Sequence, residues 1–326
     1  MLSETRVVAI GGGTGLSTML KGLKLHTHNI TAVVTVADDG GSSGMLRTDF
    51  GMVAPGDIRN CVNALAEVDP VMGELLNFRF QGGSLKGHSL GNLFLAALNE
   101  TSSSFDEAVK KFSHLAGVVG TVYPVTNEAV TLGACLEDGT VIMGESNIGH
   151  HRDWQRTPIN SVFLTPEKPK PVDGVIRAIE KADIIVLGPG SLYTSIIPNL
   201  LVDGVADAIR NSRAVKIYVC NIMSQGGETE GYTASDHLKA IEKHSYEGIA
   251  DVVITNNAAV PDSIKELYAE EHAEVVTVDE EEILKKTLLV QGNLLLVQNS
   301  KIRHNFSRLA RTIMQIGTSK DFFENK

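Results

Sequence analysis

Short apolar runs alternate along the chain with stretches whose apolar residues recur every three or four positions. The first run, residues 7–10, leads into a glycine cluster, and apolar residues then recur at helical spacing over 16–23. Further strand-like runs lie at 30–37, 184–187, 215–221 and 252–255, and helical patterns lie at 175–181, 200–211 and 236–243. Strands that alternate with helices pair in parallel and bury both faces of their sheet. The pattern therefore predicts an α/β fold with a mostly parallel sheet covered by helices.

Residues 118–171 have a different pattern. Strand-like runs occupy 118–125, 129–136 and 141–145, and the turn Glu137-Asp138-Gly139 separates the last two. Such a turn between apolar runs is typical of a β-hairpin. A proline-rich connector at 165–171 closes the segment. We interpret about 118–171 as a small β-rich insertion in a single domain that covers residues 1–326.

Composition limits which binding partners and which cellular compartment we expect for this protein. The formal net charge is −10 and no long basic run is present, which argues against nucleic acid as the main partner. The cysteines Cys61, Cys135 and Cys220 lie far apart without CxxC spacing, as expected in a reducing compartment and unlike a zinc site. A strand pattern begins at residue 7, so we expect no signal peptide, and no apolar run reaches the length that spans a bilayer. We expect a cytoplasmic protein with no membrane span; acidic α/β proteins of this size are often homodimers.

Two glycine-rich loops are candidates for phosphate binding. The first contains Gly12, Gly13, Thr14 and Gly15 and precedes a helix, whose free N–H groups attract anions. It departs from the strict dinucleotide fingerprint because Leu16 stands where the third glycine belongs. A tight turn without a ligand is the alternative. The second loop offers a further anion nest, formed by Gly188, Gly190, Ser191 and Thr194.

Acidic and hydroxyl side chains follow the second strand. Asp38 and Asp39 stand where a dinucleotide fold places its ribose-binding acid, and two adjacent carboxylates could instead hold Mg²⁺ against a phosphate. A third interpretation is that Asp39 only caps the loop. Ser42 and Ser43 follow and could donate to an anion or belong to a mobile lid.

Two predicted helix starts carry further polar residues. Asp57 and Arg59 lie together at the first, where Arg59 could clamp a phosphate or simply pair with Asp57. His88 and Asn92 lie at the second, where His88 could donate to an anion, act as an acid–base group or serve a capping role.

Charged residues elsewhere are weaker candidates. The pair His150-His151 has no third ligand nearby, so we do not expect a metal site there. The basic residues of the tail could face a phosphate, although a solvated C-terminal helix is the commoner meaning of such charges; these residues are Lys301, Arg303, His304, Arg308 and Arg311.

Six motifs in order resemble the CofD-like family and, within it, the YvcK branch of gluconeogenesis factors. They occupy residues 11–16, 37–44, 55–59, 87–92, 187–195 and 221–225. The resemblance spans residues 6 to about 310, and it implies a three-layer α/β/α, Rossmann-like fold with its site at the loops described above.

The two branches imply different functions. CofD proteins transfer a phospholactyl group onto a deazaflavin, with Mg²⁺ and a guanine nucleotide product. The YvcK branch is associated with cell shape, with cell-wall precursor supply in gluconeogenic growth and with binding UDP-N-acetylglucosamine. By position, Tyr268 and Arg303 resemble that branch's nucleotide-sugar-binding residues. Segment 37–44 matches the YvcK branch better.

Three hypotheses follow. The first is a nucleotide-sugar-binding regulatory protein without turnover, which would hold the diphosphate on the two glycine loops, place Asp38 near the ribose and act through a cell-wall regulatory partner. The second is a Mg²⁺-dependent phospholactate transferase, with Asp38, Asp39 and Asp57 at the metal and His88 assisting proton transfer. The third is an NAD-dependent oxidoreductase, suggested only by the order strand–glycine–helix–strand–acid; NAD could also bind as a ligand without turnover.

Overall fold

The structure is a computed structural model that describes residues 2–67, 69–150 and 157–319. Its centre is a seven-stranded sheet in which every neighbouring pair is parallel. In spatial order the strands are β10 (Leu288–Gly292), β9 (Val252–Asn256), β8 (Val215–Val219), β7 (Ile184–Leu187), β1 (Val7–Gly11), β2 (Ile30–Val34) and β3 (Thr121–Pro124). The predicted parallel α/β sheet is confirmed.

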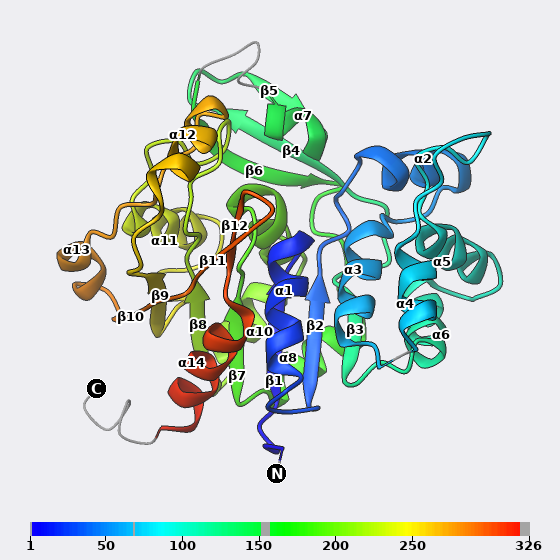
Figure 1. Ribbon diagram of the computed structural model, residues 1–326, viewed down its shortest axis with the longest axis horizontal. Helices are drawn as coiled ribbons and strands as arrows, with labels where there is room; N and C mark the ends of the chain where they lie inside the picture. Colours follow the sequence, from blue (N-terminus) through cyan, green and yellow to red (C-terminus); the bar gives the residue numbers. More distant parts are fainter. Residues whose placement is uncertain (1, 68, 151–156, 320–326) are drawn as a thin grey trace.

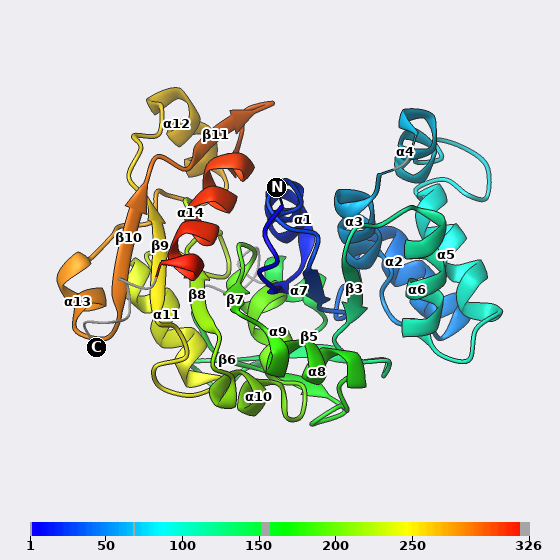
Figure 2. The same ribbon diagram turned by 90° about the horizontal axis from the view of Figure 1, so that it is seen from below.

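Helices cover both faces of this sheet and complete the three layers (Figures 1 and 2). One face carries α1 (Gly13–Leu23), α3 (Gly56–Leu65) and α14 (Phe306–Thr318). The other carries α8 (Asp173–Lys181), α9 (Ile197–Leu200), α10 (Val205–Asn211) and α11 (Ala234–Lys243). The apolar residues of α1 are fully buried at the spacing that the sequence predicts.

The strand order reverses direction at β1. The chain runs outward from β1 to β2 and β3, then returns to β7 on the other side of β1 and continues to β8, β9 and β10. Crossovers that leave β1 and β7 in opposite directions separate their loops, and ligands of open α/β sheets bind in the resulting crevice. The topology therefore places a binding site above the carboxyl ends of β1 and β7.

A helical lobe lies beyond β3, at the edge of the sheet (Figures 1 and 2). It is built from the chain between β2 and β3 and contains α2 (Gly41–Phe50), α4 (Pro70–Asn77), α5 (Leu90–Glu100) and α6 (Phe105–Leu115). Helix α2 begins at Gly41, so the 38–44 segment that the sequence presents as a loop is partly helical.

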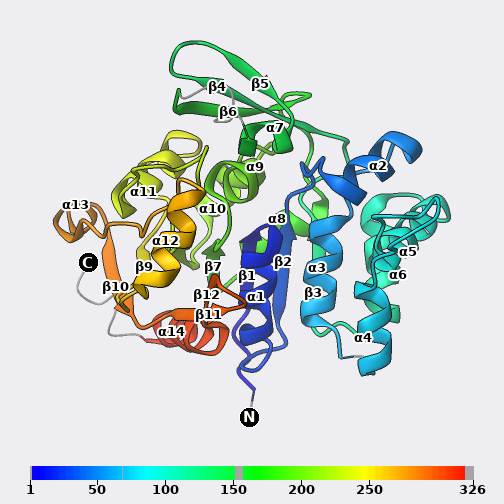
Figure 3. The same ribbon diagram turned by 45° about the horizontal axis from the view of Figure 1, so that its top comes forward.

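A second, antiparallel sheet lies above the carboxyl ends of the main strands (Figure 3). Its strands are β4 (Thr131–Leu136), β5 (Val141–Met143) and β6 (Ile159–Thr165), and α7 (Glu145–His150) follows β5. The predicted hairpin joins β4 to β5. The first strand assigned to the insertion is placed differently, because β3 pairs with β2 in the main sheet. Its residues alternate between buried and half-buried positions, as expected at a sheet edge.

Two predicted helices need correction. Residues 200–211 are not one helix: a π-turn, η2 (Leu192–Ile196), leads into α9, and α10 begins only after Gly204, whose φ of +73° interrupts the helix. The tail is not helical from residue 301 either. It forms the hairpin β11 (Leu295–Gln298) and β12 (Lys301–His304) before α14. Helices α12 (Asp262–Glu270) and α13 (Glu280–Leu284) lie beside β9 and β10.

Among the described residues no single helix is long and apolar enough to cross a membrane. One pair of consecutive helical segments, Leu192–Leu200 and Val205–Asn211, would together be long and apolar enough, but the two segments meet at an angle of 75°. This match rests on length and composition only.

Candidate functional site

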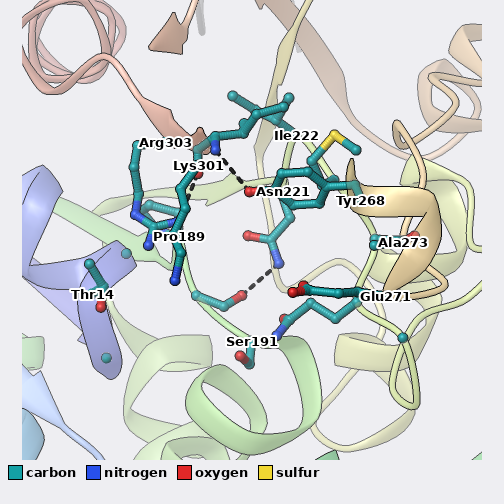
Figure 4. A pocket seen from close by; sticks show the side chains of 18 of the residues that line it. Thr14, Pro189, Ser191, Asn221, Ile222, Tyr268, Glu271, Ala273, Lys301 and Arg303 are labelled. Carbon is teal, nitrogen blue, oxygen red and sulfur yellow. Dashed lines mark hydrogen bonds between the residues drawn. The ribbon is translucent and has the colours of Figure 1, made fainter. Parts of the chain in front are cut away.

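A cavity of about 1000 Å³ opens at the switch point between β1 and β7 (Figure 4). It is at the upper end of the roughly 300–1000 Å³ usual for small-molecule sites, large enough for a dinucleotide or a nucleotide sugar. Its walls come from the loops after β1, β7 and β8, from the end of α12 and from the β11–β12 hairpin. The lining includes Gly12, Gly13, Thr14, Gly15, Gly190, Ser191, Asn221, Tyr268, Lys301 and Arg303.

The glycine loop needs its small residues for space. A Cβ on Gly12 would lie 2.7 Å from Oδ2 of Asp57, and one on Gly15 would lie 2.5 Å from the carbonyl oxygen of Pro189. Gly13 has φ +64° and opens α1, whose first-turn N–H groups have no helical acceptor. The loops after β1 and β7 therefore touch, and their glycines allow the backbone to approach a ligand closely.

The loop after β7 is held by two side chains from other elements. Asn221 Nδ2 donates to the carbonyl oxygen of Gly190 at 2.8 Å, which fixes the loop against the end of β8. The buried carboxylate of Glu228 accepts from the Tyr193 N–H at 3.3 Å and from the Thr194 hydroxyl at 3.2 Å. Burial raises the pKa of Glu228 to about 7. An internal carboxylate thus already occupies part of the anion nest that the sequence predicts around Thr194.

The C-terminal segments supply the cavity with its aromatic and basic side chains. The Tyr268 hydroxyl accepts from the Ile302 N–H at 2.8 Å and so joins α12 to β12. Arg303 and Lys301 lie on the side of the cavity that contains Thr14 and Pro189 (Figure 4). Burial lowers the pKa of the neighbouring His304 to about 4. Cationic groups on the same side of the cavity as the start of α1 suit an anionic ligand.

Sequence reasoning missed the role of Asn221; it named Lys301 and Arg303 as residues that could face a phosphate but favoured a solvated helix, whereas both lie on β12 and line the cavity. The available signal for the hairpin was Asn299-Ser300 between two strand-like runs. Both residues have positive φ, 50° and 58°, as a two-residue hairpin turn requires.

Carboxyl groups gather behind the glycine loop. Asp57 is buried and accepts from the Gly13 N–H; burial, then the charge of Asp38, raises its pKa to about 6. Glu145 of α7 lies in the same electrostatic environment, where burial, followed by the charges of Asp38 and Glu228, raises its pKa to about 8. When ionised, these carboxyl groups place negative charge next to the predicted phosphate loop. The raised pKa values of Asp57 and Glu145 favour their protonated forms, which reduces that charge.

Asp39 and Asp38 have different surroundings. Both carboxylate oxygens of Asp39 accept bonds from the start of α7: the Glu145 N–H at 3.1 Å, the Ser146 N–H at 2.9 Å and the Ser146 hydroxyl at 2.7 Å. Asp38 accepts from the Gly40 N–H at 3.0 Å. Asp39 therefore caps the start of α7, the helix that follows β5 of the antiparallel sheet.

Ser42, His88 and Asn92 form a buried polar cluster between α2 and α5. The Ser42 hydroxyl lies 3.1 Å from His88 Nδ1 and accepts from Asn92 Nδ2 at 3.1 Å. Ser89, not His88, caps α5. Ser43 is also buried, and its hydroxyl would be 2.5 Å from a Cβ on Gly56.

Arg59 extends this polar region. It donates to the side-chain oxygens of Asn60 at 2.8 Å and Asn77 at 3.3 Å, and within the described residues no ion pair joins it to Asp57. Its Nε and the Oδ1 of Asn92 are buried without a hydrogen-bond partner in this part of the chain. None of these residues lines the main cavity. The structure thus divides the predicted site residues into a cavity group and a buried group.

Histidines and acids do not gather into a metal site in the described ranges. No group of three or more His, Cys, Asp or Glu side chains there is arranged to hold an ion. His150 lines the cavity, and His151 lies outside the described residues.

Comparison with known proteins identifies the family. The family model described as 2-phospho-L-lactate transferase CofD matches residues 7–296. The chain belongs to the CofD family. A protein of Thermoanaerobacterium thermosulfurigenes is 52% identical over 314 residues, which are 96% of this chain and 97% of that relative. The gluconeogenesis factor of Bacillus subtilis is 44% identical over 318 residues, 97% and 99% of the two chains.

A solved structure shows the same fold within the CofD family. The crystal structure of protein BH3568 from Bacillus halodurans superposes with a TM-score of 0.92 at 45% identity. The match covers 96% of this chain and all of that one, 100%. The predicted three-layer α/β/α, Rossmann-like architecture is therefore confirmed.

Proposed function

We propose that this protein is a cytoplasmic regulator that binds UDP-N-acetylglucosamine without turning it over, and that it maintains cell shape and cell-wall precursor supply during gluconeogenic growth. The observation that carries the proposal is that the glycine loop with Thr14, the ring of Tyr268 and the guanidinium of Arg303 line one cavity. The name gluconeogenesis factor, carried by the Bacillus subtilis relative, supports the metabolic setting. A regulator of this kind would act through a cell-wall regulatory protein partner.

The chemistry of the lining suits the parts of such a ligand. Thr14 and Gly15 offer first-turn N–H groups that lack a helical acceptor to a diphosphate, and Lys301 and Arg303 offer cations from the same side of the cavity. Tyr268 and Ile222 offer an aromatic and apolar surface to a base. Asn221, Ser191 and Glu271 offer donors and acceptors to sugar hydroxyls.

Titration calorimetry with UDP-N-acetylglucosamine, UDP, GDP and NAD, each with and without Mg²⁺, tests the proposal. We expect the UDP-sugar to bind without a need for Mg²⁺. Arg303→Ala should weaken binding roughly 10- to 100-fold, since charge-assisted hydrogen bonds are worth about 1.5–3 kcal/mol. Arg311→Ala, an exposed arginine of α14 outside the cavity, is the matched control. Hydrolysis or transfer of the bound sugar would contradict the proposal.

A second candidate is a Mg²⁺-dependent transferase like 2-phospho-L-lactate transferase. The family name and the acidic residues Asp38 and Asp57 behind the glycine loop favour it. The fit to Mg²⁺ is incomplete, because Asp39 uses both oxygens to cap α7 and the described residues contain no three-ligand cluster. Mg²⁺-dependent binding of GDP without binding of the UDP-sugar would favour this candidate over the regulator.

A further inference from the structure

Glu228 is a buried carboxyl group close to the cavity wall. It belongs to the loop between β8 and α11, in which Ser224, Gln225 and Gly226 line the cavity. Glu228 is only 7% exposed and does not line the cavity itself. The N–H groups of Glu228 and Thr229 both donate to the carbonyl oxygen of Gln225, at 3.1 Å and 2.9 Å. This turn fixes the carboxyl group a few residues from groups that a ligand would contact.

The carboxylate of Glu228 is bonded to the first residues of η2. Its two oxygens accept from the Tyr193 N–H and the Thr194 hydroxyl, and the Thr194 N–H is a third donor. Ser191, which precedes η2, and Ser195, within it, both line the cavity (Figure 4). The start of one helical segment thus contacts both an internal carboxylate and the ligand cavity.

The loop before η2 also touches the predicted phosphate loop. A Cβ on Gly190 would lie 3.4 Å from the carbonyl oxygen of Gly12, and one on Gly15 would lie 2.5 Å from the carbonyl oxygen of Pro189. A diphosphate at the start of α1 would therefore lie against the loop that Glu228 supports from behind. Two negative charges that are close in a protein interior each disfavour the ionisation of the other.

Glu228 has no cationic partner in the part of the chain that the structure describes. No lysine, arginine or histidine of the described ranges forms an ion pair with it. The titratable groups near it are Tyr193, whose hydroxyl is bonded to that of Tyr232, and Glu145 of α7, whose pKa is raised in part by the charge of Glu228. Burial raises the pKa of Glu228 itself to about 7, so this group exchanges its proton near neutral pH.

We propose that Glu228 is a proton site coupled to the cavity, and that its carboxyl group takes up a proton from solvent when an anionic ligand binds. The inference rests on the proposed binding of a diphosphate beside the glycine loop, and it adds a proton as a second ligand. The ligand brings negative charge and the proton removes it, so each favours the binding of the other. Acid therefore strengthens binding and alkali weakens it.

Titration calorimetry with UDP-N-acetylglucosamine, whose diphosphate keeps its charge between pH 6 and pH 8, tests this coupling. We expect the bound ligand to disfavour ionisation of Glu228 about tenfold, so affinity should fall about fivefold from pH 6 to pH 8. At pH 7 about 0.4 proton should be taken up, measured in two buffers of different ionisation enthalpy. Glu228→Gln, which keeps the shape of the side chain but does not titrate, should remove this share of both effects. Glu247→Gln, at an exposed glutamate outside the cavity, should retain them.

A second variant tests the coupling without altering Glu228. Thr194→Val removes one donor to the carboxylate, so the ionised form is less stabilised and the fall in affinity should move to higher pH. An unmoved pH profile in Thr194→Val would overturn the inference. Equal proton uptake by wild type and Glu228→Gln would overturn it as well, because another group would then bind the proton.

A second probe separates this inference from the proposed function. Sulfate is an anion whose charge does not change between pH 6 and pH 8. If sulfate binds with uptake of a proton at Glu228 and the UDP-sugar does not bind, the coupling holds and the proposed function fails. If the UDP-sugar binds with the same affinity at pH 6 and pH 8, the proposed function holds and the coupling fails. If neither anion binds, both fail.

Discussion

Position 12 in the glycine loop has no room for a side chain. Gly12 has φ −168°, which any residue can adopt, so space and not conformation requires glycine there. An added Cβ would be 2.7 Å from both Asp57 Oδ2 and Thr35 Cγ2. We expect Gly12→Ala to displace the loop and weaken binding of the UDP-sugar roughly tenfold or more by calorimetry. Gly82→Ala, where a Cβ meets nothing within 4 Å, is the control, and equal affinities in the two variants would contradict this account.

The buried carboxyl of Asp57 makes stability depend on pH. Its pKa is raised from 3.8 to about 6, so the folded protein holds this proton more tightly than the unfolded chain does. The resulting stabilisation is complete below pH 3.8 and disappears as the pH rises to about 6, a change of about 3 kcal/mol. Asparagine does not titrate, so Asp57→Asn does not lose this stabilisation. The free energy of unfolding of the variant minus that of the wild type should therefore rise by up to about 3 kcal/mol from pH 4 to pH 7. Urea unfolding at both pH values measures the difference, and a pH-independent difference would refute the assignment.

Single residues could be predicted from sequence where their partners are local. The loop of Gly12 and Gly13 follows from a strand, a glycine cluster and a helix within a short segment. The role of Asp39 could not be predicted, because its partners Glu145 and Ser146 lie more than 100 positions away. The choice between metal ligand and cap depends on that tertiary contact.

Asp39 attaches one element, α7, to the rest of the protein. Its carboxylate accepts three hydrogen bonds at the start of that helix. Asp39→Ala should lower the free energy of unfolding by about 1–2 kcal/mol, the usual cost of removing such a cap. Chemical denaturation measures this loss. Binding of the UDP-sugar should respond equally to Mg²⁺ in wild type and variant, whereas a loss of Mg²⁺ response would indicate a metal ligand instead.

The β11–β12 hairpin depends on the Tyr268 hydroxyl for its position over the cavity. Tyr268→Phe keeps the ring but removes the acceptor of the Ile302 N–H. We expect faster hydrogen exchange at Ile302 and binding weakened several-fold, since one hydrogen bond contributes about 0.5–1.5 kcal/mol. Tyr268→Ala should weaken binding further, because the ring is lost too. Unchanged exchange at Ile302 in Tyr268→Phe would show that the hairpin is held by other contacts.

Elements with strong periodicity were predictable, and short elements at the site were not. Strand β7 (Ile184–Leu187) has the same bounds as the apolar run that predicts it. Strand β12 is too short to show a period, and its basic residues read equally well as helix. Strand β3 was identified as a strand but assigned to the wrong sheet, since pairing with β2 is a long-range property.

For the whole molecule, the strand order determines where the cavity forms. Loops from β1, β7 and β8 meet there only because the crossovers diverge at β1. The sequence predicts loops at the carboxyl ends of parallel strands, and so predicts their convergence. It does not predict that the buried residues Ser42, His88 and Asn92 lie outside the cavity, because the helical lobe that holds them folds away from β1.

The net charge of the protein and the charges inside the cavity have opposite effects on an anionic ligand. The net charge of −10 repels an anionic nucleotide at long range, whereas Lys301 and Arg303 attract it inside the cavity. Salt screens exposed charges beyond about 8 Å at physiological ionic strength and affects close contacts much less. Raising salt from low to physiological levels should therefore speed association of the UDP-sugar several-fold in stopped-flow measurements. Lys301→Ala should mainly speed dissociation at every salt concentration. Association that slows with salt would show instead that the basic wall governs the approach of the ligand.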